Sequence, residues 1–229
     1  MKENRIIIDT EDGSSSIFDP ITGEHYHSTH GAITESEHVF IKNGLSQLDM
    51  TKRSLSILEI GFGTGLNALL ALNFLKDRDI ECHYYSIEKY PIPFEMVQRL
   101  NYCQLLGDMT LRDSFIKMHQ CNWEEVIEIT PLFFIKKMRQ DISELKLDDI
   151  TFDIVFFDAF SPNVQPELWT TTIFKALYNN LNENGLLTTY SVQGLVKNNL
   201  RSVGFKVKRL QGPPGKHHML NAFKISDIV

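Results

Sequence analysis

The sequence predicts an α/β protein with a mostly parallel sheet and helices on both faces. Short apolar segments typical of buried strands alternate with segments that carry apolar residues at helical spacing, which favours strand-helix-strand units. The first strand of this series runs into a glycine-rich turn, and several others end in acidic residues. The chain has 229 residues, 42% of them hydrophobic, which is enough to bury one full core.

The first fifty residues stand outside this alternation. Residues 5–8 and 15–18 favour a small hairpin around Glu11-Asp12-Gly13, and residues 35–48 favour a helix. We expect residues 1–50 to form an extension that packs across one end of the domain of residues 51–229, as a lid or substrate wall. The whole chain is then a single structural unit.

The alternation begins near residue 55. Strands are predicted at 55–60, 82–87, 152–157, 185–190, 205–210 and 220–223. Helices are predicted at 65–75, at 91–105, where prolines suit a first turn, and at 166–181, which ends before Asn-Gly. Residues 123–138 favour a hairpin around Thr130-Pro131 that carries the third strand of the sheet.

The glycine-rich turn after the first of these strands predicts a Rossmann-like nucleotide site. Its spacing is G-x-G-x-G, whereas dinucleotide sites have G-x-G-x-x-G, and an acid, Glu59, precedes it. A carboxylate there would repel a pyrophosphate but could accept hydrogen bonds from an ammonium group. We therefore expect S-adenosylmethionine, and hence a class I methyltransferase fold, with cofactor contacts from Glu59, Gly61, Phe62, Gly63, Gly65 and Asn67.

Two further acids follow predicted strands. Glu88 ends the strand at 82–87, where a Rossmann-like unit places the carboxylate that binds ribose hydroxyls. Asp141 follows the hairpin and is a candidate for the adenine amino group, although an exposed loop acid is the alternative interpretation.

Asp158 ends the strand at 152–157 and is the candidate catalytic residue, beside the reactive methyl group of the cofactor. Methyl transfer is a direct displacement at carbon, so alignment is the main task of the enzyme. A carboxylate suits an amine nucleophile, because it can hold the amine and accept its proton. Phe160 and Trp169 could wall the substrate or stack on a base, with a place in the core as the alternative.

Composition excludes several classes of protein. A net charge of −6 argues against a protein that coats nucleic acid non-specifically. A local basic patch is compatible with it, and basic residues gather in the C-terminal third: Lys197, Arg201, Lys206, Lys208, Arg209, Lys216, His217 and His218. The patch is read either as a binding surface or as a solvated face.

The sequence also predicts no membrane partner and no metal. No apolar run approaches the roughly 20 residues of a spanning helix, and the start lacks a signal-peptide core, so we expect a cytoplasmic protein. Three cysteines without paired spacing are typical of reduced thiols. The histidines of the first forty residues match no closed tetrahedral site.

Several longer motifs resemble the methyltransferase part of the MnmC family over nearly the whole chain. The most selective are Asp-Ala-Phe-Ser-Pro at 158–162 and Pro-Glu-Leu-Trp-Thr at 166–170. They are accompanied by matching segments at 11–14, 24–28, 31–32, 35–40, 59–67 and 215–220.

The resemblance implies an activity on tRNA. Members of the family use S-adenosylmethionine to methylate the primary amine of 5-aminomethyl-2-thiouridine at the wobble position, giving 5-methylaminomethyl-2-thiouridine. In bifunctional members an FAD-dependent oxidase follows and makes that amine, whereas this sequence ends at Val229. We therefore expect a separate enzyme to supply the amine. Lys216 in the tail motif is expected to bind substrate, although His217 and His218 replace the Arg-Glu that the family usually has there.

Three other functions stay open at this stage. A methyltransferase for another amine substrate would not depend on tRNA. An aminopropyltransferase shares the fold and an amine nucleophile but would carry a more glycine-rich, acid-containing first loop. A degenerate, non-catalytic RNA-binding module would have no need of the acids Glu59, Glu88 and Asp158.

Overall fold

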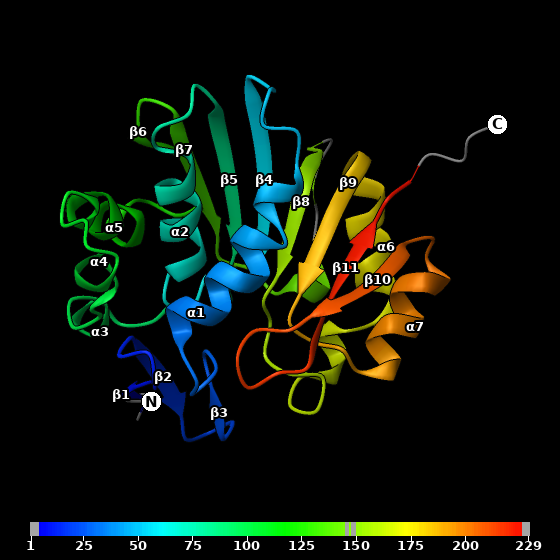
Figure 1. The fold of residues 1–229 in the computed structure, drawn as a ribbon, viewed down its shortest axis with the longest axis horizontal. Helices are drawn as coiled ribbons and strands as arrows, with labels where there is room; N and C mark the ends of the chain where they lie inside the picture. Colours follow the sequence, from blue (N-terminus) through cyan, green and yellow to red (C-terminus); the bar gives the residue numbers. More distant parts are fainter. Residues whose placement is uncertain (1–4, 145–146, 148–149, 226–229) are drawn as a thin grey trace.

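A mixed sheet forms the centre of the protein. In the residues that the computed structural model describes, 5–144, 147 and 150–225, eight strands follow the order β10-β11-β9-β8-β4-β5-β7-β6 (Figure 1). The middle five are parallel: β4 (Ser54–Ile60), β5 (Glu81–Ile87), β7 (Phe133–Met138), β8 (Phe152–Phe157) and β9 (Leu181–Thr189). Antiparallel strands extend both edges: β6 (Val126–Thr130), β10 (Lys206–Gln211) and β11 (His218–Phe223).

Helices cover both faces of this sheet, because its strands are apolar on both sides; every residue of β8 is buried. On one face, buried side chains of α2 (Leu66–Leu75), α5 (Leu111–Gln120) and the π-helix η1 (Glu37–Lys42) form one core with the strands. On the other face, α6 (Thr171–Asn180) and α7 (Gly194–Ser202) form a second core. The predicted α/β class with a mostly parallel sheet is confirmed.

The site end of the sheet is fixed by topology. β4 pairs with β5 on one side and with β8 on the other. The strand order therefore reverses at β4, which makes it the topological switch point of the sheet. Ligands of open α/β sheets bind at the carboxyl ends of the strands that flank such a switch point.

The N-terminal extension lies at this end. Strands β1 (Ile6–Asp9), β2 (Ser15–Asp19) and β3 (Glu24–His25) form a small antiparallel sheet, at the lower edge of Figure 1. Helix α1 (Ala32–Ser36) then leads into η1, whose residues Val39 and Phe40 join the first core. Residues 1–4 of the predicted extension lie outside the described residues.

Some predicted elements differ from the structure. The helix expected at 91–105 is two short ones, α3 (Phe94–Val97) and α4 (Tyr102–Leu105), separated by a turn in which Asn101 binds the backbone of the extension at Ser15 and Gly13. The helix expected at 35–48 is divided among α1, η1 and the 3₁₀ turn η2 (Leu45–Gln47). Two further 3₁₀ turns are η3 (Ile142–Glu144) and η4 (Pro166–Leu168). Among the described helices, none is long and apolar enough to cross a membrane.

Candidate active site

A cavity of about 1190 Å³ opens at the carboxyl ends of β4, β5 and β8. Its walls are the loops that follow these strands, the N-terminal extension and Lys216, in the loop before β11 (His218–Phe223). Pockets for one small ligand commonly measure roughly 300–1,000 Å³. This cavity is large enough to hold a nucleoside-type cofactor and part of a second ligand together.

The glycine turn forms the floor of the cavity, and its tight backbone leaves no room for side chains there. Gly61, Gly63 and Gly65 have φ of 93°, 50° and 72°, in the left-handed region that favours glycine. A Cβ on Gly61 would lie 2.8 Å from the carbonyl oxygen of Asp158, and one on Gly65 would lie 2.6 Å from His119 Nε2. The turn is therefore pressed between two neighbours and leaves its open side to a ligand. Phe62 is buried but also lines the cavity.

Glu88 lies at the edge of the cavity, directly after β5. Its Oε2 accepts a hydrogen bond from Gly63 N at 3.0 Å and its Oε1 one from Tyr90 N at 2.7 Å. Each oxygen keeps a further lone pair for a ligand hydroxyl. The arrangement is compatible with ribose binding, a role that stays a prediction.

Asp141 also lines the cavity but is engaged by other groups. Lys89 Nζ lies 2.5 Å from its Oδ2, and Ser143 N donates to its Oδ1 at 2.9 Å. The hydrogen bond from Lys89 lowers the pKa of Asp141 to about 2. The carboxylate therefore stays ionised at the cavity edge, and its contact with adenine remains a prediction.

Glu59 lies beneath the turn and does not reach the cavity. Its side chain is fully buried between β4 and β5, where its Oε2 accepts a hydrogen bond from Ser86 Oγ at 2.6 Å. Burial raises the pKa of this carboxyl well above its usual range and so favours the neutral form. Glu59 is not among the residues that line the cavity, and its neutral form would not attract an ammonium group by charge, so its contact with the cofactor stays a prediction. It supports the turn from below.

Asp158 enters the cavity directly after β8, and Asn67 holds it there. Asn67 Nδ2 donates to Asp158 Oδ2 at 2.8 Å, and Asp158 N donates to the carbonyl of Ile60 at 3.0 Å. Burial raises the pKa of Asp158 to about 7, against the Asn67 hydrogen bond and with help from the nearby carboxylate of Glu35. A carboxylate with a pKa near 7 can accept a proton from a reacting group at neutral pH.

Aromatic side chains surround the Asp158 half of the cavity. Tyr26 meets Phe160 edge to face at 5.2 Å between ring centroids, and Tyr190 donates its hydroxyl hydrogen to the carbonyl of Ala159 at 2.8 Å. Lys216 Nζ lies 4.4 Å from the Tyr190 ring centroid and pairs with Glu35. Tyr26, Phe160, Tyr190 and Lys216 all line the cavity, so this half offers aromatic rings and a positive charge to a ligand.

Tyr26, Glu35 and Tyr190 also line the cavity, although the sequence motifs did not predict them there. Tyr26 and Glu35 lie inside the segments 24–28 and 35–40 that resemble the family, and this resemblance was the available signal for them. Tyr190 directly follows the buried strand β9, and no motif marked it.

Trp169 was expected to wall the substrate, and the structure places it in the core instead. Its side chain is fully buried, with its ring 4.7 Å from that of Phe157, and its Nε1 donates to the carbonyl of Phe160 at 2.9 Å. Trp169 therefore positions the Phe160 loop and does not line the site.

The N-terminal extension completes the cavity wall. His27 is half-buried between the Ser16 hydroxyl, 3.1 Å from its Nδ1, and the Thr64 hydroxyl, 3.3 Å from its Nε2. Burial lowers the pKa of His27 to about 4, so the ring is neutral and links the extension to the glycine turn. Ser161 Oγ also donates to Glu24 Oε1 at 3.3 Å.

The charges around the cavity favour a cationic ligand. Seven carboxyl side chains line it, against three Lys or Arg side chains. S-adenosylmethionine fits this set. It carries positive charges on its sulfur and ammonium groups and has no phosphate, and its ribose hydroxyls can donate hydrogen bonds to carboxylates. When bound, it supplies a methyl group activated by the sulfonium. In the described part of the chain no three His, Cys, Asp or Glu residues group as metal ligands.

Comparison with known proteins supports S-adenosylmethionine as the cofactor. Residues 109–225 match the model of a family described as S-adenosyl-L-methionine-dependent methyltransferase. The chain is 29% identical, over 92% of its length, to the tRNA 5-methylaminomethyl-2-thiouridine biosynthesis bifunctional protein MnmC of Burkholderia multivorans. A second such protein, from Burkholderia pseudomallei, is also 29% identical over 92% of the chain. The chain spans about a third of the length of each relative, 33% and 34%.

A solved structure shows the same fold. The crystal structure of MNMC2 from Aquifex aeolicus matches with a TM-score of 0.74 at 27% identity, covering 96% of this chain and 70% of that one. These similarities confirm the resemblance to the methyltransferase part of MnmC. Because the family model covers more than half of the chain, the protein belongs to the S-adenosyl-L-methionine-dependent methyltransferase family.

Proposed function

We propose that this enzyme methylates the primary amine of 5-aminomethyl-2-thiouridine at the wobble position of tRNA, giving 5-methylaminomethyl-2-thiouridine. The observation that carries the proposal is the place of Asp158. It stands where the cofactor half of the cavity, floored by the glycine turn, meets the aromatic half around Tyr26, Phe160 and Tyr190. The names of the relatives supply the nucleoside.

The chain's own residues would then act on the amine. An alkylammonium has no lone pair, so the nitrogen must lose a proton before or during attack on the methyl carbon. Asp158 would accept that proton as the new nitrogen–carbon bond forms and the bond from carbon to sulfur breaks. Asn67 would keep the carboxylate pointed at the nitrogen through its hydrogen bond to Oδ2.

The aromatic half would hold the base. Tyr26 and Phe160 offer ring surfaces for a uracil, and the pair of Lys216 with Glu35 fixes the far wall. Stacking of a base on an aromatic ring contributes roughly 1–3 kcal/mol. To enter such a cavity, the base must unstack from the neighbouring bases of the RNA. This is easiest for an unpaired nucleotide.

The proposal includes a separate source for the amine. Methyl transfer adds a carbon and cannot remove a carboxymethyl group by oxidation, so the aminomethyl form must be made by another activity. A tRNA substrate would place the enzyme in the cytoplasm.

Reconstitution tests the proposal. Purified protein, S-adenosylmethionine carrying a labelled methyl group and tRNA bearing 5-aminomethyl-2-thiouridine are incubated, and the nucleosides are separated by mass. We expect the aminomethyl nucleoside to gain one methyl group, while tRNA bearing the carboxymethylaminomethyl form gains none. Binding of the cofactor without transfer to any amine-bearing tRNA would contradict the substrate assignment. Transfer of an aminopropyl group from decarboxylated cofactor would instead indicate the aminopropyltransferase alternative.

A further inference from the structure

The C-terminal part of the chain is charged very differently from the rest. Residues 184–225 contain seven Lys or Arg and no Asp or Glu. The other 16 of the 23 Lys and Arg stand among all 29 Asp and Glu. A chain with a net charge of −6 therefore has one cationic segment.

The fold gathers five cations of this segment at one edge of the molecule, four of them exposed and Lys197 half-buried. Strand β10 is the outer strand of the sheet, next to α7. These two elements carry five cations, which we call the basic face: Lys197, Arg201, Lys206, Lys208 and Arg209.

Packing of β10 places its cations on both sides of the edge. Val207 packs against the core beneath α7, and Leu210 packs against the core on the opposite face. Because side chains alternate along a strand, Arg209 lies on the side of Val207 and Lys208 on the side of Leu210. Both cations are exposed to solvent.

The cations of the basic face differ in their partners from four lysines elsewhere in the protein. Lys52, Lys76, Lys89 and Lys224 each pair with a carboxylate. Within the described residues, none of the five cations of the basic face lies in an ion pair. Their charge is uncompensated and available to a polyanion.

Strand β10 of the basic face leads into a loop that reaches the active site. The loop between β10 and β11 runs from the edge strand to the extension, as the orange-red trace in Figure 1 shows. His38 Nε2 lies 2.9 Å from the carbonyl oxygen of Gln211, the last residue of β10, and Lys216 in the loop lines the cavity. The acid-lined cavity itself repels phosphates, so an RNA that delivers a base to it needs a positive surface beside the opening.

We propose that the basic face binds the phosphate backbone of the tRNA stem next to the modified uridine, while the uridine enters the cavity. This inference rests on the proposed function and adds where the RNA lies. Phosphate contacts position a nucleic acid without reading its sequence, which suits lysine and arginine on an exposed edge.

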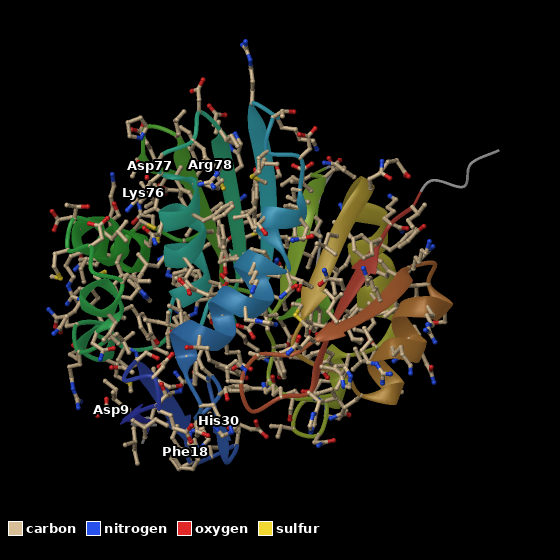
Figure 2. All side chains as sticks on the ribbon, in the orientation of Figure 1. Asp9, Phe18, His30, Lys76, Asp77 and Arg78 are labelled. Carbon is tan, nitrogen blue, oxygen red and sulfur yellow. The ribbon has the colours of Figure 1, made fainter. Side chains whose placement is uncertain are left out.

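A pair of matched double variants tests the inference. K208A/R209A removes one Lys and one Arg from the basic face. K76A/R78A removes the same two residue types at the end of the molecule away from the extension; Figure 2 labels both residues there, and labels His30 of the extension at the other end. tRNA binding is measured by fluorescence anisotropy across a series of salt concentrations.

The expected result follows from counterion release. Each lost phosphate contact lowers the slope of log K against log salt by roughly 0.7–0.9, so K208A/R209A should lower its magnitude by about 1.6 and weaken binding about 20-fold near 0.15 M salt. K76A/R78A should bind as the parent protein does. Equal slopes and affinities for the parent and K208A/R209A would overturn the inference, as would tighter binding to anionic lipid vesicles than to tRNA.

Two controls separate other causes. Lysines on an edge strand also prevent pairing with another sheet, so K197A/R201A on α7, which has no strand edge, must show the same loss of slope. Methylation of the free 5-aminomethyl-2-thiouridine nucleoside should be unchanged in all variants. If the parent protein methylates neither tRNA nor nucleoside, the proposed function fails; if it methylates both and the basic-face variants match it on tRNA, only this inference fails.

Discussion

Replacement of Asp158 by Asn is the sharpest perturbation of the site. Asn has nearly the same shape and keeps an oxygen that can accept the hydrogen bond from Asn67, 2.8 Å away in the parent protein. It cannot accept a proton. The variant therefore removes the proposed chemistry and leaves the surrounding packing in place.

The expected loss is large and depends on pH. General acid–base groups contribute roughly 10²–10⁴-fold to rate, so single-turnover methylation should fall at least about 100-fold, or about 2.7 kcal/mol of barrier. With a pKa of about 7, about one tenth of Asp158 is ionised at pH 6 and about nine tenths at pH 8. The positive charge of a bound cofactor lowers that pKa, so the parent rate should rise through an inflection at or below pH 7. D158N should lack this inflection and keep only the rise that belongs to the amine.

The same substitution should raise the stability of the protein at neutral and alkaline pH, although it lowers the methylation rate. The folded state raises the pKa of Asp158 from 3.8 to about 7, so the stability linked to this group is present at acid pH and lost as pH rises through 7. Three pK units correspond to about 4 kcal/mol, an upper bound because Asp158 borders the open cavity. D158N should therefore unfold at higher temperature than the parent protein at pH 8, with the gap closing towards pH 4.

Both assays can refute the reasoning. A D158N rate within threefold of the parent, with the acidic inflection retained, would remove Asp158 from proton transfer. A D158N protein that is less stable than the parent at pH 8 would show that the carboxyl is not held in a site that disfavours its charge.

Other substitutions test the supporting residues. Glu88→Ala should weaken S-adenosylmethionine binding by about 1.5–3 kcal/mol, roughly 10- to 150-fold, in calorimetry; unchanged affinity would exclude the ribose role. Glu59→Gln should change the free energy of unfolding by less than about 1 kcal/mol below pH 4.5, where the acid is neutral in both states, and should become more stable than the parent as pH rises to neutral, because burial raises the pKa of Glu59 in the folded state only. A loss of several kcal/mol in denaturant titration would mean that the charge is needed. Asp12→Ala should lower the free energy of unfolding by about 2–4 kcal/mol, since its carboxylate accepts hydrogen bonds from Ser14 and Thr34. Although burial opposes it, these bonds hold the pKa of Asp12 well below its usual range, so the loss should be greatest at neutral pH and shrink in acid.

The sheet was largely predictable from the sequence, because its signals are local. The strand expected at 152–157 is β8 to the residue, since a run of buried apolar residues between polar ones leaves little choice. β9 starts earlier than expected, at Leu181, because a register shift against β8 and the left-handed Asn184 let the chain join the sheet before Gly185. Such an irregularity depends on the neighbouring strand and leaves no trace in the sequence pattern.

The helices and the site were predictable only in part. Helix α5 was not predicted, although its buried residues Leu111, Phe115 and Met118 follow helical spacing. For the site, strand ends located Glu88 and Asp158 correctly in the cavity wall, because carboxyl ends of parallel strands share one edge. Position along a strand did not reveal side-chain direction at a turn, so Glu59 was expected in the cavity and lies beneath it.

Contacts between distant segments explain the remaining differences. Glu35 reaches Lys216 across 181 positions of sequence, and this pair forms a wall of the cavity that no local pattern predicts. Trp169 belongs to a motif that resembles a functional one, yet its hydrogen bond to Phe160 and its packing on Phe157 give it a supporting place. A motif therefore indicated which loop matters and not which of its side chains faces the ligand.

The most direct test of the central claim is nucleoside analysis of tRNA from cells that lack this gene and from the same cells complemented with the parent gene or with D158N. The account predicts that 5-methylaminomethyl-2-thiouridine disappears, that 5-aminomethyl-2-thiouridine accumulates in its place, and that only the parent gene restores the methylated form. An unchanged level of 5-methylaminomethyl-2-thiouridine in the deletion strain, or full restoration by D158N, would contradict it.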